Sequence, residues 1–166
     1  RSPIRIGSSA DQALIKSLLR QARTAAGQSD FEAAEGGFRR ALELQARIFG
    51  EDDLATNDIL MDLAMAVSAQ GRHGEAEALI RRAAPIVEKS PKSADRARLS
   101  GYQAYVAANK GDFDAALTQA RAATAQWRTI VAQAASRPGG SGQTALVAND
   151  TGSEAEAELA MALNLE

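Results

Sequence analysis

Residues 31–44 read FEAAEGGFRRALEL, and this stretch decides the fold. Its members Phe31, Ala34, Phe38 and Ala41 recur at intervals of three and four residues, which is the spacing of one face of an α-helix. The pattern returns 42 residues later, and again 40 residues after that, at these positions: His73, Ala76, Ile80 and Ala83, then Phe113, Ala116, Ala120 and Ala123. Three copies in register predict a chain that is built from structural repeats.

Another amphipathic pattern and a short turn precede each copy. The preceding pattern carries a small residue at the matching place, Ala22, Ala64 or Ala104, where two helices can approach closely. Ser9 and Gln12 have the spacing of a capping box and predict the start of the first of these helices. We therefore predict first helices over 10–27, 54–70 and 93–109, and second helices over 30–48, 73–89 and 113–136.

The segments outside these helices complete the predicted organisation. Residues 1–9 form an irregular lead-in, and residues 10–136 form an array of three repeats, at about 10–50, 54–90 and 93–136. Residues 137–152 are predicted to be a Gly-rich flexible loop, and 153–166 a seventh helix that is either a cap or the first helix of a further repeat. Because Arg1 opens the chain and apolar spacing still runs at its end, we expect a fragment of a longer protein.

The composition favours an all-α fold. The chain has 166 residues, of which 37 are alanine, seven are aromatic and none is cysteine. Alanine is the best helix former and is depleted in strands, and the missing cysteines remove disulfides and thiolate chemistry. The 19 basic and 21 acidic residues give a net charge of −2, which argues against nucleic acid and anionic membrane as partners. The compartment is not fixed, although a cytoplasmic location is favoured.

The recurring pattern resembles the tetratricopeptide repeat. It consists of a small residue in the first helix, a turn such as Gly71-Arg72-His73, and alanines that flank a bulky residue in the second helix. The 42-residue period, together with Phe49-Gly50-Glu51-Asp52, is similar to the kinesin-light-chain subtype. The resemblance implies a right-handed α–α superhelix, a solenoid of three helix-turn-helix repeats plus the seventh helix. It also implies a concave groove, lined by the first helices, that binds a peptide or a helix of a protein partner.

Carrying over the family's groove positions of the first helices names a candidate peptide-binding site. Its basic end, methionine-containing middle and two-tyrosine end suit a peptide with an acidic residue beside apolar anchors. Met61 and Met65, and likewise the two tyrosines, could be packing residues instead. Arg20 and Arg23 could instead form an ordinary solvated face of the helix. The candidate residues are Lys16, Arg20, Arg23, Asp58, Met61, Asp62, Met65, Arg98, Tyr102, Tyr105 and Asn109.

The sequence supplies no recognisable catalytic, cofactor or metal site. His73 is the only histidine and occupies an aromatic slot of the repeat, which favours packing. The acidic residues near Asp53 fit no calcium loop and are interpreted as helix caps. Arg39 and Arg82 belong to arginine pairs on the outer helices, which we interpret as solvated. A family clamp for chain-terminal carboxylates is not reproduced, since it requires lysine in place of Leu19.

Three functional hypotheses follow. The first is a non-enzymatic interaction module that presents its groove to a protein segment. The second is a regulatory or substrate-recruiting domain in cis of a larger bacterial enzyme, since bacterial proteins with similar repeats often carry a caspase-like CHAT peptidase domain. The 15 arginines against four lysines suggest a GC-rich bacterial genome. The third is a scaffold that self-associates through its C-terminal helix.

Overall fold

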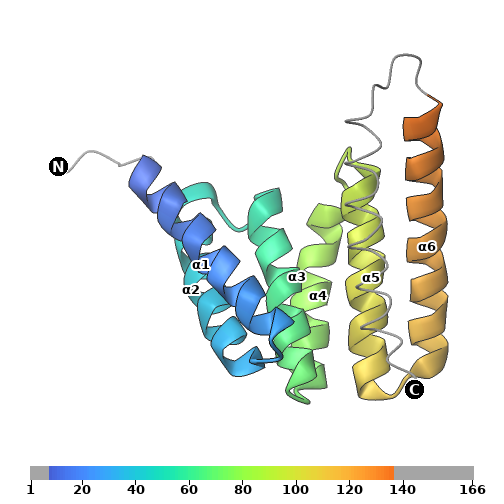
Figure 1. Ribbon diagram of the computed structural model, residues 1–166, viewed down its shortest axis with the longest axis horizontal. Helices are drawn as coiled ribbons and strands as arrows, with labels where there is room; N and C mark the ends of the chain where they lie inside the picture. The colour runs from blue at the N-terminus through green and yellow to red at the C-terminus, as the bar shows by residue number, and fades with distance from the viewer. Residues whose placement is uncertain (1–7, 137–166) are drawn as a thin grey trace. The chain divides into compact units, whose positions relative to one another are not determined.

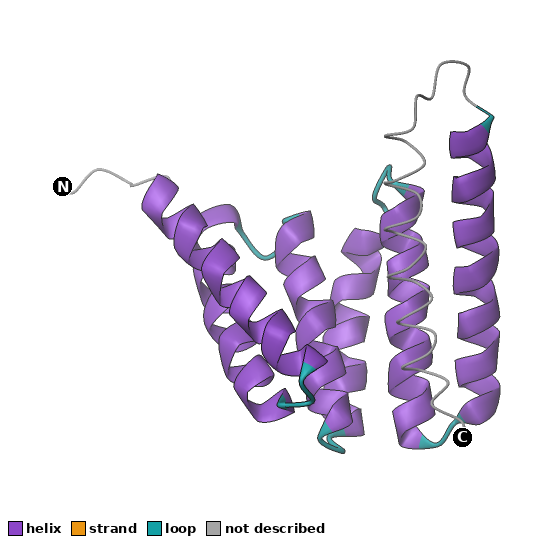
Figure 2. Cartoon of the chain, viewed as in Figure 1, coloured by secondary structure: helices purple, strands orange, loops and turns teal. Residues whose placement is uncertain are grey.

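The computed structural model describes residues 8–136, and every element in that range is a helix (Figures 1 and 2). The elements are α1 (Ser9–Gly27), α2 (Phe31–Phe49), α3 (Leu54–Ala69), α4 (His73–Val87), α5 (Ser93–Lys110) and α6 (Phe113–Ala135). They fall into two compact units, residues 1–86 and 87–166. The predictions for 1–7, for the loop 137–152 and for the helix 153–166 lie outside the described residues.

The observed helix bounds lie within two residues of the predicted ones, but the first cap differs. Ser8, not Ser9, is the N-cap residue of α1, and its hydroxyl accepts a hydrogen bond from the backbone N–H of Asp11 at 3.2 Å. The Asp11 carboxylate accepts the Ser8 backbone N–H in return, at 3.0 Å. An aspartate placed in the first turn also interacts favourably with the helix dipole, which explains why this pair is used instead of Ser9 and Gln12.

The first unit is built on the close contact between α1 and α2. The buried residues of α1 are Ile15, Leu18 and Ala22, and those of α2 include Phe38, which is fully buried. Ala22 lies so near α2 that a Cβ added at Gly37 would be 2.8 Å from the Ala22 Cβ. The small residue predicted in the first helix therefore permits this close approach.

Helix α3 is the most completely buried helix of the first unit, and it contacts α2. Even the polar residues of its first turn are buried, because their side chains donate hydrogen bonds to backbone carbonyls of the segment between α2 and α3. Thr56 Oγ1 donates to the Gly50 carbonyl at 2.7 Å, and Asn57 Nδ2 donates to the Glu51 carbonyl at 2.9 Å. The two loop carbonyls thus receive their hydrogen bonds from side chains instead of backbone N–H groups, and these bonds hold the start of α3 in place relative to α2.

The second unit is the hairpin of α5 and α6. Near the start of α5, Ala97 packs against Trp127, with Ala94 and Ile130 beside them. Towards the other end of the hairpin, Ala104 packs against Ala120. Alanine thus fills the middle of this interface, and the one large aromatic lies late in α6.

The three turns within the repeats close in the same way. The backbone N–H of Asp30, Arg72 and Asp112 donates to the carbonyl five residues earlier, at 2.9, 3.2 and 2.9 Å. The residue before each donor has a positive φ: 61° at Ser29, 84° at Gly71 and 88° at Gly111. This left-handed closure is the common way of ending a helix, and it normally uses glycine.

Candidate peptide-binding face

A hollow of about 480 Å³ lies over α1. The residues that line it lie at positions i, i+3, i+4, i+7 and i+8 and therefore share one side of the helix. They are Lys16, Leu19, Arg20, Arg23 and Thr24. Lys16, Arg20 and Arg23 are three of the predicted groove residues, and all three are exposed. Thr24 was not predicted as a groove residue, although it follows Arg20 by four residues and donates its hydroxyl to the Arg20 carbonyl at 2.9 Å.

An ion pair connects this hollow to α3. Arg23 donates from Nη2 and Nε to Asp62 Oδ2, at 2.8 and 3.2 Å. The Asp62 side chain is only 5% exposed, whereas that of Arg23 is 55% exposed. Asp62 therefore compensates part of the charge of Arg23 and holds its guanidinium in place. Lys16 and Arg20 have no ion-pair partner within residues 8–136, so the hollow keeps an excess of positive charge.

The remaining predicted residues of α3 divide by burial. Met61 is fully buried, so the prediction that it lines an open groove is wrong. The reason is that α3 is buried on nearly all sides, and Met61 serves the core. Asp58 and Met65 are half-buried and keep part of their surface accessible.

The second unit carries the other predicted residues. Tyr102 is only 7% exposed, which argues against the prediction that it lines the peptide-binding groove. Tyr105 is half-buried and packs against the contact between Ala104 and Ala120. Arg98 is half-buried and Asn109 is exposed.

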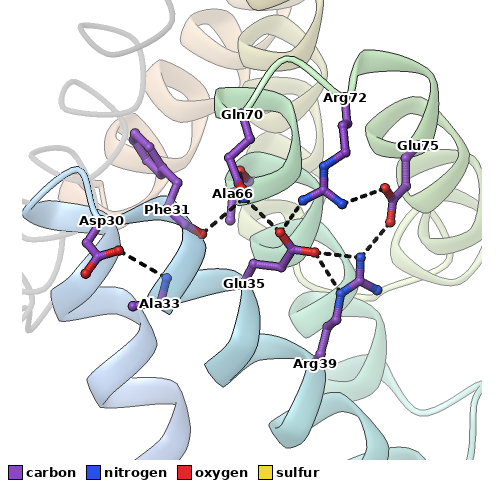
Figure 3. Close-up of polar contacts among 9 residues, drawn as sticks. All are labelled: Asp30, Phe31, Ala33, Glu35, Arg39, Ala66, Gln70, Arg72 and Glu75. Carbon is purple, nitrogen blue, oxygen red and sulfur yellow. Dashed lines mark hydrogen bonds and ion pairs between the residues drawn. The ribbon is translucent and has the colours of Figure 1, made fainter.

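A polar network between α2 and α4 was missed by the sequence analysis (Figure 3). Arg39 donates to Glu35 at 2.8 Å and to Glu75 at 2.6 Å. Arg72 donates to both of the same carboxylates, at 3.1 Å to Glu75. Gln70 Nε2 adds a hydrogen bond of 2.8 Å to Glu35. Arg39 is thus paired, not merely solvated; only its spacing of four residues from Glu35 was a signal in the sequence.

The network perturbs the titration of its members. Burial by itself would raise the pKa of the Glu35 carboxyl, but the hydrogen bonds that it accepts lower that pKa from 4.5 to about 2. The hydrogen bond to Glu35 raises the pKa of Arg72, and the one to Glu75 raises that of Arg39. The Glu35 carboxylate and the two guanidinium groups are therefore charged at neutral pH. The network connects the two repeats of the first unit.

The helical pairs, the shared left-handed turns and the buried alanines define a helical repeat. A family model described as tetratricopeptide repeat matches residues 13–89. These residues belong to the tetratricopeptide repeat family. No curated protein sequence matches the chain. The match covers α1 to α4, and α5 and α6 repeat its pattern with Gly111 in the turn. The kinesin-light-chain subtype stays a prediction.

Tetratricopeptide repeats are generally protein-interaction modules and typically bind protein partners. The family is typically non-enzymatic. In the described part of this chain, no group of three or more histidines and carboxylates could hold a metal ion. None of the described helices has the length and apolarity to cross a membrane. His73 begins α4, and its Nδ1 is buried with no hydrogen-bond partner among the described residues.

Proposed function

We propose that this chain is a non-enzymatic module that binds a segment of a partner protein, with the hollow over α1 as its anchoring site. The observation that carries the proposal is the coincidence of two independent results. The family's groove positions predict Lys16, Arg20 and Arg23 on α1, and the hollow is lined by these three residues together with Leu19 and Thr24. A site of this shape and charge fits an extended peptide or a helix of the partner.

The chemistry of the hollow indicates the side chains that it would accept. Lys16 and Arg20 present two cations with no ion-pair partner in the described part of the chain, while Leu19 offers apolar surface between them. Arg23 is held by Asp62, so part of its hydrogen-bonding capacity is already used. A partner segment with a carboxylate next to an apolar side chain would satisfy both kinds of surface. Half-buried Met65 could extend the apolar contact along α3.

The proposal is tested by selecting peptides from a displayed random library on the full chain and measuring their affinity by fluorescence polarisation. The variant Lys16→Glu with Arg20→Glu reverses two charges at the hollow. The matched control, Arg40→Glu with Arg81→Glu, reverses two exposed charges on the outer helices α2 and α4. We expect the first variant to lose about tenfold or more in affinity, roughly 1.4 kcal/mol, and the control to bind like the parent.

Added salt should weaken binding of the selected peptides to the parent chain, because the hollow contacts are charged. If the selected peptides bind the hollow variant as tightly as the parent, the anchoring site lies elsewhere and the proposal is wrong. If both double variants lose binding equally, the effect is one of net charge and the hollow is not specific. Far-UV circular dichroism verifies that each variant remains folded.

A further inference from the structure

Helix α6 carries most of the large apolar side chains that the described part of the chain leaves exposed. Phe113 is 60% exposed, Leu117 41% and Val131 40%. Together with the half-buried Thr124, they recur at intervals of four and seven residues and therefore follow one side of the helix. We call Phe113, Leu117 and Val131 the α6 stripe. It borders the side of α6 that faces α5, where Ala120 and Trp127 are buried.

The first unit shows what covers the equivalent side of a second helix. Phe113 and Leu117 stand where α2 has Phe31 and Glu35 in the repeat register. In the first unit, Gln70 at the C-terminal end of α3 donates to the Phe31 carbonyl at 3.2 Å and to Glu35 at 2.8 Å. The helix that follows in sequence therefore lies on this side of α2. On α6 the equivalent position is apolar, which suits a helix with an apolar face.

Charge complementarity indicates which segment would suit the α6 stripe. Arg121 and Arg128 follow Leu117 and Thr124 by four residues, are exposed, and have no ion pair within residues 8–136. The segment 153–166 of this chain contains four glutamates and no basic residue, and its leucines include Leu159 and Leu163. Its predicted amphipathic pattern thus combines the apolar surface and the negative charge that the α6 stripe and its two arginines would bind.

We propose that the α6 stripe is the docking surface for residues 153–166 of the same chain. The two sequences are separated by 16 residues, 137–152, and a linker of that length gives an effective concentration in the millimolar range. Even weak docking would then be populated within one molecule. This surface is distinct from the hollow over α1, and the inference does not depend on the function proposed for that hollow.

The absence of cysteine from the sequence gives a direct test in the full chain. Leu117→Cys places a thiol on the α6 stripe, and Thr118→Cys places one on the next, exposed position. We expect a thiol reagent to label Cys at 117 about tenfold more slowly than Cys at 118, because only the undocked population reacts. Adding Leu159→Glu together with Leu163→Glu should abolish this difference. Val131→Cys and Ala132→Cys form a second pair, in case Leu117→Cys itself weakens docking.

The effect of dilution on the labelling rates identifies what occupies the α6 stripe. Protection at 117 and 131 that is unchanged by dilution, and that Arg121→Glu with Arg128→Glu lowers several-fold, supports docking within one chain. Protection that disappears on dilution means that a second copy occupies the stripe, and it overturns the proposal. Equal labelling within both pairs of positions, in protein whose far-UV circular dichroism is that of the parent, means that nothing covers the stripe and also overturns it.

Discussion

The hairpin of α1 and α2 and the hairpin of α5 and α6 share one repeat pattern, but they bury their large aromatic side chain at different places along the second helix. In the first, Phe38 is fully buried in the middle of α2, and Gly37 lets α1 approach closely. In the second, Ala120 stands at the position of Phe38, and Trp127, seven residues later, supplies the large buried side chain. Both hairpins therefore bury one large aromatic side chain along the second helix, but on different turns of it.

The outward sides of the two hairpins differ as well. Glu35 on α2 is held by charged and polar partners from the next repeat, whereas Leu117, its counterpart on α6, is 41% exposed. Glu35, inside the described array, thus lies in an ionic network, whereas Leu117, at the equivalent position of the last described helix, is apolar and exposed. The predictions below probe this contrast, beginning with the largest expected effect.

Removing the aromatic anchor should be most costly in the first hairpin. Phe38→Ala is expected to lower the free energy of unfolding by about 3–5 kcal/mol, because the side chain is fully buried and leaves a cavity. Leu14→Ala, at a residue of α1 that is 46% exposed, is the control and should change stability by less than about 0.5 kcal/mol. Urea denaturation followed by circular dichroism measures both. Similar losses for the two variants would contradict the view that Phe38 anchors the hairpin.

Two adjacent glycines of α2 should respond in opposite ways to alanine. Gly37→Ala places a Cβ 2.8 Å from the Ala22 Cβ, so the helices must separate, and we expect a loss of about 1–3 kcal/mol. At Gly36 nothing lies within 4 Å of the added Cβ, and Gly36→Ala should stabilise the helix by about 0.5–1 kcal/mol. Thermal and urea unfolding of the two variants separate these effects. A stabilising Gly37→Ala would show that the close approach is not required.

The ionic network makes the stability of the first unit depend on acid. The folded-state pKa of Glu35, about 2, lies below its ordinary value of 4.5. The stabilisation is therefore complete above the ordinary value and is lost as the pH falls through the folded value. The Arg39 and Arg72 side chains are nearly half exposed, so water screens the network. We therefore expect ionised Glu35 to contribute roughly 1 kcal/mol to the free energy of unfolding.

The measurement compares the parent with Glu35→Gln in urea at decreasing pH. The difference in unfolding free energy between them should shrink between about pH 4.5 and pH 2. Glu43→Gln changes an exposed carboxyl of the same helix and is the control; it should show no comparable trend. A difference between the parent and Glu35→Gln that stays constant over this range would mean that the network does not stabilise the fold.

The sequence predicted the helices well because each depends on local spacing. The recurrence of Phe31, Ala34 and Phe38 fixes the face of one helix, and the turn residues fix its ends. It did not predict the burial of Met61, because spacing along one helix does not reveal how many neighbours surround it. The pairing of Arg23 with Asp62 was missed for a related reason. The two residues were predicted to share a groove, but a contact 39 residues apart depends on how α1 and α3 are placed.

The smallest expected effect concerns the turn that distinguishes the first hairpin from the others. Ser29 adopts φ 61° where the later turns have glycine, although the closing hydrogen bond is the same. A non-glycine residue pays about 1–2 kcal/mol for this conformation, and part of the gain from Ser29→Gly is offset by greater freedom of the unfolded chain. We therefore expect Ser29→Gly to stabilise by about 0.5 kcal/mol, and Gly111→Ala to destabilise by about 1 kcal/mol. At Gly111 nothing lies within 4 Å of the added Cβ, so a loss there measures backbone strain alone. Should Ser29→Gly lower the urea midpoint, the serine side chain must stabilise the turn by more than its backbone strain costs, and the first turn would differ from the others in mechanism as well as in sequence.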